Sequence, residues 1–157
     1  MRHEIEPLES SLWFARIELI AWNGLGGIEN SLRHAGHLMQ LAPASFRGAA
    51  HLEDEDAFEA LLDTEDFDAA ARCLVHPDYL DLRESKGEAA AWIACPMLER
   101  TVEGAGRSAA EAVLDAWSKR LLALRDACGG ARVGPADRVA RALTPEPAVQ
   151  LGIGAAR

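Results

Sequence analysis

The segment from residue 108 to residue 128 constrains the fold of this chain more than any other. Ser108 and Glu111 have the spacing of a capping box, in which a hydroxyl and a carboxylate satisfy backbone N–H groups at a helix start. Apolar residues then recur at alternating steps of four and three, namely Ala110, Leu114, Trp117, Leu121, Leu124 and Cys128. Such a seam is typical of one helix packed against another. We therefore predict a long, packed helix over 108–128.

Similar apolar periodicity, interrupted by glycine and proline, predicts helices along most of the chain. They are expected at residues 8–23, 28–42, 54–63, 66–75, 88–103, 108–128 and 135–143. Alanine, which favours helix, is abundant, whereas the residues that favour strands are scarce. The first helix is apolar around nearly its whole circumference, so we expect it to be buried. The expected fold is all-α: a compact bundle of about six to seven helices in a single domain at 1–143, with a C-terminal tail at 144–157.

Charge and cysteine content narrow the function classes. The formal net charge of −9 argues against binding to nucleic acid or to an anionic membrane, because both need a basic surface. No stretch has the ~18 consecutive apolar residues of a membrane span, and acidic residues stand where a signal peptide would be apolar. Three widely spaced cysteines indicate a reducing compartment. We expect a cytoplasmic protein, and the alanine- and arginine-rich composition is typical of GC-rich bacterial genomes.

Acidic residues are concentrated in one segment. Residues 53–68 contain nine Asp and Glu and no Lys or Arg. The segment is explained either as a well-capped, solvated helical hairpin or as a surface that docks a basic partner. In the 108–128 helix, the apolar seam could pack within the chain or anchor a partner through its tryptophan. The predicted partner-binding residues are Asp54, Glu55, Asp56, Glu59, Trp117 and Leu121.

Two other clusters could hold a small ligand. His34 and His37 share a helix face, and with Glu29 they offer the nitrogen and oxygen ligands that zinc or iron accept. Histidines at the boundary of the core explain the same pattern, and the Glu-x-x-His motif of di-iron bundles is missing. Arg107 and Ser108 precede free helix N–H groups that could bind phosphate or carboxylate, unless the capping box already satisfies those donors.

Evidence for catalysis is weak. Arg16, Glu18 and Asn23 interrupt the apolar first helix, either as a buried polar network or as the lining of a small enzyme's pocket. The cysteines lie in apolar runs that disfavour the thiolate, and no nucleophile or nucleotide-binding motif is present. We predict no catalytic residue and no cofactor. Whether the protein is an enzyme stays open, and the sequence favours the absence of enzymatic activity.

The sequence favours a non-enzymatic helical module for protein–protein interaction, such as an adaptor, chaperone, immunity or accessory protein. It would bind a protein partner, or a second copy of itself, through the acidic hairpin at 53–68 or the helix at 108–128. The first alternative is a helical bundle that binds a metal or small anion at Glu29, His34 and His37 or at Arg107 and Ser108. The second is a small enzyme with a pocket near Arg16, Glu18 and Asn23.

Overall fold

The computed structural model describes residues 7–22 and 26–128. The chain divides into two units, residues 1–122 and 123–157, and the described part of the second unit is the last stretch of a helix. The helix expected at 135–143 and the tail expected at 144–157 lie outside the described residues.

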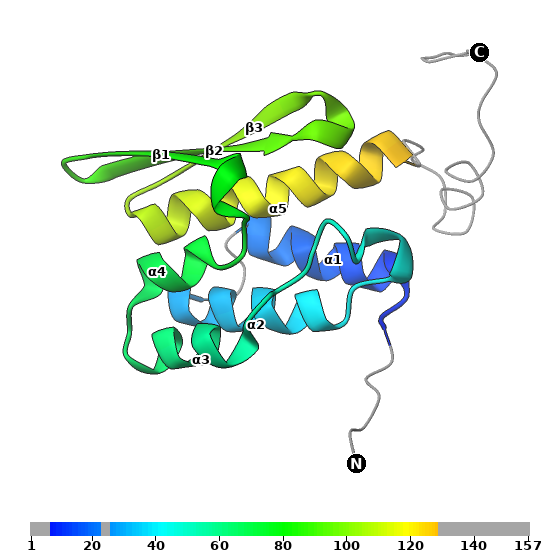
Figure 1. Cartoon of the computed structure of the whole chain (residues 1–157), viewed down its shortest axis with the longest axis horizontal. Coiled ribbons are helices and arrows are strands. Elements are labelled where there is room, and N and C mark those ends of the chain that lie inside the picture. Colours follow the sequence, from blue (N-terminus) through cyan, green and yellow to red (C-terminus); the bar gives the residue numbers. More distant parts are fainter. Residues whose placement is uncertain (1–6, 23–25, 129–157) are drawn as a thin grey trace. The chain divides into compact units, whose positions relative to one another are not determined.

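Within the described residues, the fold combines five α-helices with a three-stranded antiparallel sheet. The helices are α1 (Ser10–Ala21), α2 (Ile28–Gln40), α3 (Glu55–Asp63), α4 (Phe67–Arg72) and α5 (Ala109–Cys128). The strands are β1 (Leu80–Ser85), β2 (Glu88–Cys95) and β3 (Arg100–Gly106), in the order β1-β2-β3. The sheet covers one side of α5 over residues 109–122, and the four shorter helices lie on its other side (Figure 1).

The expectation of an all-α helical bundle is wrong, because residues 80–106 form the sheet. The helix predicted over 88–103 is β2, a 3-10 turn at Pro96–Leu98 and the first part of β3. Along β2, side chains are alternately buried and half-buried from Ala89 to Cys95, which is the period of a strand. Alanine occupies positions on both faces of β2, so the sequence conceals this alternation. Packing against α5 overrides the helix propensity of these alanines.

Glycine allows β3 to lie directly on the backbone of α5. A Cβ atom on Gly104 would be 2.3 Å from the backbone nitrogen of Ala116 and 2.5 Å from the carbonyl oxygen of Ala112. A Cβ atom on Gly106 would be 2.4 Å from the Cβ of Glu111. Ala112 and Ala116 are fully buried. Small residues on both elements therefore set the short distance between the sheet and the helix.

A second set of contacts holds the helices on the other side of α5. Trp13 is fully buried, and its indole N–H donates to the carbonyl oxygen of Leu38 at 2.7 Å, which joins α1 to α2. Phe14 packs edge-on against Trp13 and Phe46, with ring centroids 4.9 and 4.8 Å apart. Trp117 of α5 is also fully buried. Burying aromatic side chains of this size is the main contribution to the stability of such a core.

The start of α5 follows the sequence prediction closely. The backbone N–H of Glu111 donates to the Ser108 hydroxyl at 3.2 Å, and the Glu111 carboxylate accepts from the backbone N–H of Arg107 at 3.1 Å. Asp68 of α4 adds a third contact, because its carboxylate accepts from the backbone N–H of Ala110 at 2.9 Å. The donors at this helix start are thus partly satisfied by the protein itself.

Among residues 7–22 and 26–128, no helix combines the length and apolar character needed to cross a lipid bilayer.

Candidate functional site

The face of the sheet that points away from α5 is the clearest candidate site, and we call it the open sheet face. Side chains alternate along a strand, and Gly104 and its cross-strand partner Ala91 lie on the buried side. The open sheet face therefore consists of Asp81, Arg83, Ala90, Trp92, Ala94, Thr101, Glu103 and Ala105. These side chains are exposed or half-buried, and no described element covers them.

Trp92 lies at the centre of the open sheet face, between two carboxylates. It is paired in register with Asp81 on β1 and with Glu103 on β3. Side chains directly opposite one another on neighbouring strands have Cβ atoms about 5 Å apart. Asp81 and Glu103 are both exposed, whereas the indole is half-buried. This row presents an aromatic ring with negative charge on either side.

Arg83 lies over the ring of Trp92, with its guanidinium carbon 5.4 Å from the ring centroid. A cation in this position is attracted by the negative charge of the aromatic face. The neighbours of Trp92 along its own strand are Ala90 and Ala94, and Ala105 is paired with Ala90. These side chains are too small to cover the indole, so Trp92 and Arg83 stand above the rest of the face.

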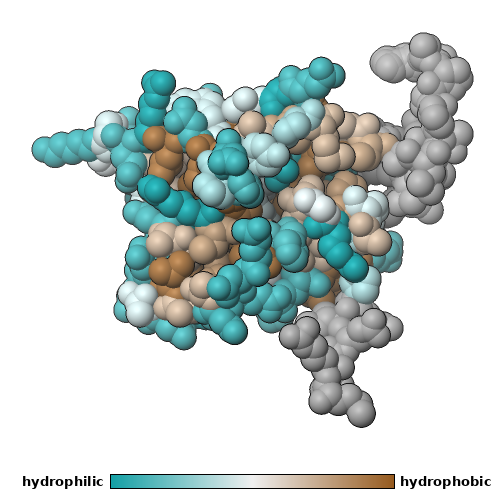
Figure 2. Space-filling model, in the orientation of Figure 1, coloured by the Kyte–Doolittle hydropathy of each residue, from teal (hydrophilic) through white to brown (hydrophobic). Residues whose placement is uncertain are grey.

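Two shallow hollows flank this ridge. One, of about 710 Å³, is lined by Arg83, Glu88, Ala90, Trp92, Ala105 and Arg107 among others. The other, of about 610 Å³, is lined by Asp78, Tyr79, Asp81, Trp92, Ala94 and Thr101 among others, and Arg83 is the only basic residue among the described residues that line it. The second hollow therefore combines two aromatic rings with two aspartates. Residues of the hydrophilic tip of the β1–β2 hairpin, 85–88, line the first hollow, and this tip projects from the surface (Figure 2).

The acidic residues predicted to bind a partner are all exposed, but several have structural roles. Asp54 accepts from the backbone N–H of Ala57 at 3.0 Å and caps α3, while Asp66 caps α4 in the same way. Glu55 and Asp56 lie in the first turn of α3, where negative charge suits the helix dipole. Capping and dipole effects explain much of this acidic segment, and its role in binding stays a prediction.

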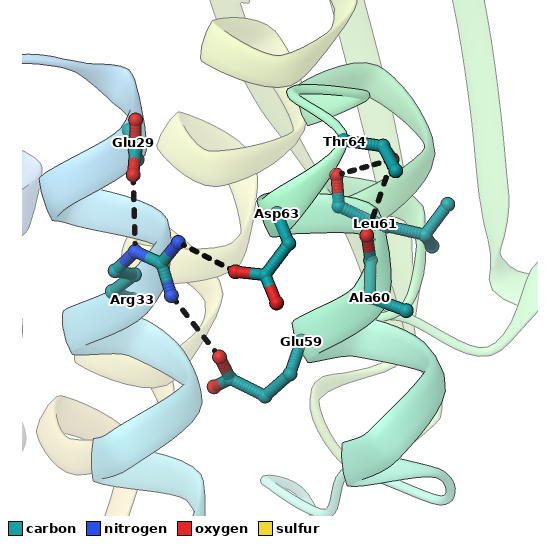
Figure 3. A network of polar contacts seen from close by, with 7 residues as sticks. All are labelled: Glu29, Arg33, Glu59, Ala60, Leu61, Asp63 and Thr64. Atoms are coloured by element: carbon teal, nitrogen blue, oxygen red, sulfur yellow. Dashed lines mark hydrogen bonds and ion pairs between the residues drawn. The ribbon is translucent and has the colours of Figure 1, made fainter.

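Glu59, another of these residues, belongs to an ion-pair network between α2 and α3 (Figure 3). The guanidinium of Arg33 donates to Glu29 at 3.1 Å, to Glu59 at 3.1 Å and to Asp63 at 3.3 Å. The hydrogen bond to Glu29 is the largest of the effects that raise the pKa of Arg33. The network joins the two helices, and it engages one of the carboxylates that the sequence assigned to a metal.

The proposed metal ligands Glu29, His34 and His37 lie on α2. Burial, with the positive charges of Arg16 and His37, lowers the pKa of His34. The His34 Nε2 atom is buried, and it has no hydrogen-bond partner among the residues that the structure describes. His37 is exposed. Within the described ranges, no group of three His, Cys, Asp or Glu side chains is arranged to hold a metal ion. The metal site stays a prediction that the geometry does not support.

The predicted anion site at the start of α5 is partly filled by the protein's own groups. Ser108 and Asp68 accept hydrogen bonds from two of the free backbone donors. The Arg107 side chain is 85% exposed and lies 3.8 Å from the Glu111 carboxylate. An incoming anion would compete with the carboxylates of Asp68 and Glu111, so the structure adds no support to this prediction.

Trp117 and Leu121, predicted as partner anchors, have no exposed surface. Up to residue 122, the apolar seam of α5 packs within the chain, which was the alternative interpretation of this pattern. A partner could reach these two side chains only if the core opened.

Helix α1 differs from the expectation that it is buried on all sides. Trp13, Phe14, Ile17 and Ile20 are buried, but Leu12, Leu19 and Trp22 are 44%, 41% and 72% exposed. Of the suggested pocket residues, Arg16 is exposed, Glu18 is half-buried, and Asn23 lies outside the described residues. An enzyme pocket at this place stays an untested prediction.

The sequence analysis missed the open sheet face because it assigned its residues to a helix. One signal was available: residues 80–85 alternate Leu80, Asp81, Leu82 and Arg83, which is the pattern of a half-buried strand. Trp92 could have been placed on the exposed face only after the pairing of β1 with β2 was known.

Comparisons with protein-family models, with curated proteins and with solved structures found no match to this chain. Function is therefore inferred from the geometry of the described residues.

Proposed function

We propose that this chain is a non-enzymatic protein-binding module that holds a basic segment of a partner protein on the open sheet face. The observation that carries the proposal is the position of Trp92 between the carboxylates of Asp81 and Glu103. An aromatic ring flanked by carboxylates suits the side chain of arginine or lysine, whose stem packs on the ring while its charge meets the acids.

The hollow between Tyr79 and Trp92 is the best place for such a side chain. Asp78 and Asp81 line it, and in the described part of the chain Arg83 is the only basic residue that does. The floor is made by Ala94 and Thr101, which leave room for a long side chain above them. The net charge of −9 would also attract a basic partner from a distance.

The shape of the face favours binding over catalysis. Both hollows are open to water along the sheet, whereas catalytic sites commonly exclude water so that their polar groups act strongly. Cation–aromatic contacts at exposed sites contribute about 0.5–1 kcal/mol, and exposed ion pairs contribute about 0–1 kcal/mol. A few such contacts give weak, salt-sensitive and readily reversible binding, which suits an adaptor or accessory protein.

The test is the binding of a short fluorescent peptide in which arginine alternates with alanine, measured by anisotropy with the full chain. A matched peptide carries glutamine in place of arginine. We expect the arginine peptide alone to bind, and added salt to weaken its binding because exposed charges are screened.

Three variants localise the binding. Glu103→Gln and Trp92→Leu should each weaken binding about 2- to 5-fold, which corresponds to the loss of one exposed contact of about 0.5–1 kcal/mol. Glu55→Gln, which removes an exposed carboxylate from α3, is the matched control and should bind like the wild type. Circular dichroism checks that each variant is folded. Equal weakening by Glu103→Gln and Glu55→Gln, or no binding of the arginine peptide, would refute the proposal.

A further inference from the structure

The outer edge of β1 offers unpaired backbone groups. β1 is paired with β2 alone, and in the part of the chain described here its residues make no backbone hydrogen bond on the other side. The opposite edge of the sheet differs, because the backbone N–H of Ala105 on β3 donates to the Asp115 carboxylate of α5 at 3.0 Å. An open edge is a template for another strand.

Two copies of β1 can pair only in certain registers. In an antiparallel pair, residues directly opposite one another lie on the same face of the sheet. When a two-fold axis relates two identical strands, each residue must therefore lie opposite a residue whose side chain points to the same face. The axis then lies midway between one residue of β1 and its copy in the second strand. Near the middle of β1 this residue is Asp81, Leu82, Arg83 or Glu84.

Charge distinguishes these four registers. A centre at Asp81 or at Glu84 places a carboxylate opposite its own copy, and a centre at Arg83 does the same with two guanidinium groups. A centre at Leu82 places Asp81 opposite Arg83 of the second copy, and this occurs twice by symmetry. Opposite charges that face each other across strands are stabilising, and like charges are destabilising. The two half-buried Leu82 side chains would then meet on the face of the sheet opposite to the open sheet face.

We propose that the protein forms a homodimer through antiparallel pairing of its β1 strands, centred at Leu82. The two sheets then become one continuous sheet, and the open faces of both copies lie on the same side of it. This goes beyond the proposed function: it concerns the edge of the sheet rather than its face, and it does not require a basic partner.

The test uses two single variants of the full chain, D81R and R83D. Each variant places like charges opposite one another in both symmetric positions, so its dimer dissociation constant should rise about 10-fold or more over that of the wild type. Sedimentation velocity over a range of concentrations measures this. Thermal melts establish that both variants are folded.

Mixing the two variants separates pairing between copies from effects inside one chain. In a mixed pair, D81R supplies two arginines, and R83D supplies two aspartates opposite them. We expect D81R and R83D to be monomeric alone but to form a mixed dimer, which native mass spectrometry detects when one variant is isotope-labelled. A wild type that stays monomeric, variants that dimerise as well as the wild type, or a mixture that stays monomeric would each overturn the proposal. The peptide-binding test relies on Trp92 and Glu103, so its result can fail or succeed separately.

Discussion

Replacing Gly104 by alanine tests the contact between the sheet and α5, on which the position of the open sheet face depends. The added Cβ would lie 2.3 Å from the backbone nitrogen of Ala116, where ordinary contacts are 3.4–4 Å. The strand and the helix would have to separate by about 1 Å, since neither neighbour is a side chain that can rotate away.

The expected size of the effect follows from two opposing terms. Overpacking of a close contact costs about 1–3 kcal/mol, and a backbone neighbour places this site near the upper end. Alanine restricts the unfolded chain more than glycine does, and this stabilises the folded variant by about 0.4–1 kcal/mol. The net loss should be about 2 kcal/mol, which lowers the melting temperature of a domain of this size by roughly 6–10 °C.

Urea and thermal unfolding followed by circular dichroism measure this loss. Gly48→Ala is the control, because no atom of residues 7–22 and 26–128 outside its immediate neighbours lies within 4 Å of the Cβ it would add. Gly36→Ala should have an intermediate effect, since the atoms nearest to its Cβ would belong to the side-chain ring of Phe58, at 2.6 Å. A free energy of unfolding of Gly104→Ala within about 0.5 kcal/mol of the wild-type value would match the scatter of neutral surface substitutions. In that case the sheet could not lie against α5 as described.

Three further predictions concern the helices and the thiols. Burial, with nearby positive charges, lowers the pKa of His34, so the unfolded chain binds a proton at this histidine more readily than the folded chain does. The free energy of unfolding should therefore fall as the pH drops below about 6.5. Urea titrations at several pH values should show a smaller fall for His34→Gln. Asp68→Ala removes the acceptor of the Ala110 N–H and should cost about 1 kcal/mol in the same assay, whereas an unchanged midpoint would show that the cap is unimportant. Cys128 is exposed, while burial raises the pKa of the Cys73 thiol; a thiol reagent applied near neutral pH should therefore modify Cys128 first, and Cys128→Ser should abolish the fast phase.

The helices were predictable because their signals are local. The Ser108 and Glu111 capping box and the three-four spacing of the apolar residues after it depend on neighbours in the chain, and α5 occupies the expected residues. Asp54 and Asp66 are the first residues of two of the expected helices, 54–63 and 66–75, and they cap α3 and α4. The role of Asp68 at the start of α5 was not predictable, because its partner Ala110 is distant in sequence.

The sheet was not predicted because many residues of β2 and β3 are alanine or glycine, which do not show the alternation of a strand. Alanine is compatible with either face of a strand, and its helix propensity argues for the wrong structure in isolation. The strand assignment of β2 depends on contacts with β1, β3 and α5, which become visible only in three dimensions. The candidate site could not be predicted for the same reason: Asp81, Trp92 and Glu103 meet only because three strands are aligned in register.

Chemical shifts of the isotope-labelled full chain during titration with the arginine peptide test the proposed function most directly. We expect the largest changes at the indole N–H of Trp92 and at the backbone amides of Thr101 and Glu103, with little change in α3. Changes concentrated in α3 or along α1, with the Trp92 indole signal unmoved, would contradict the assignment of binding to the open sheet face.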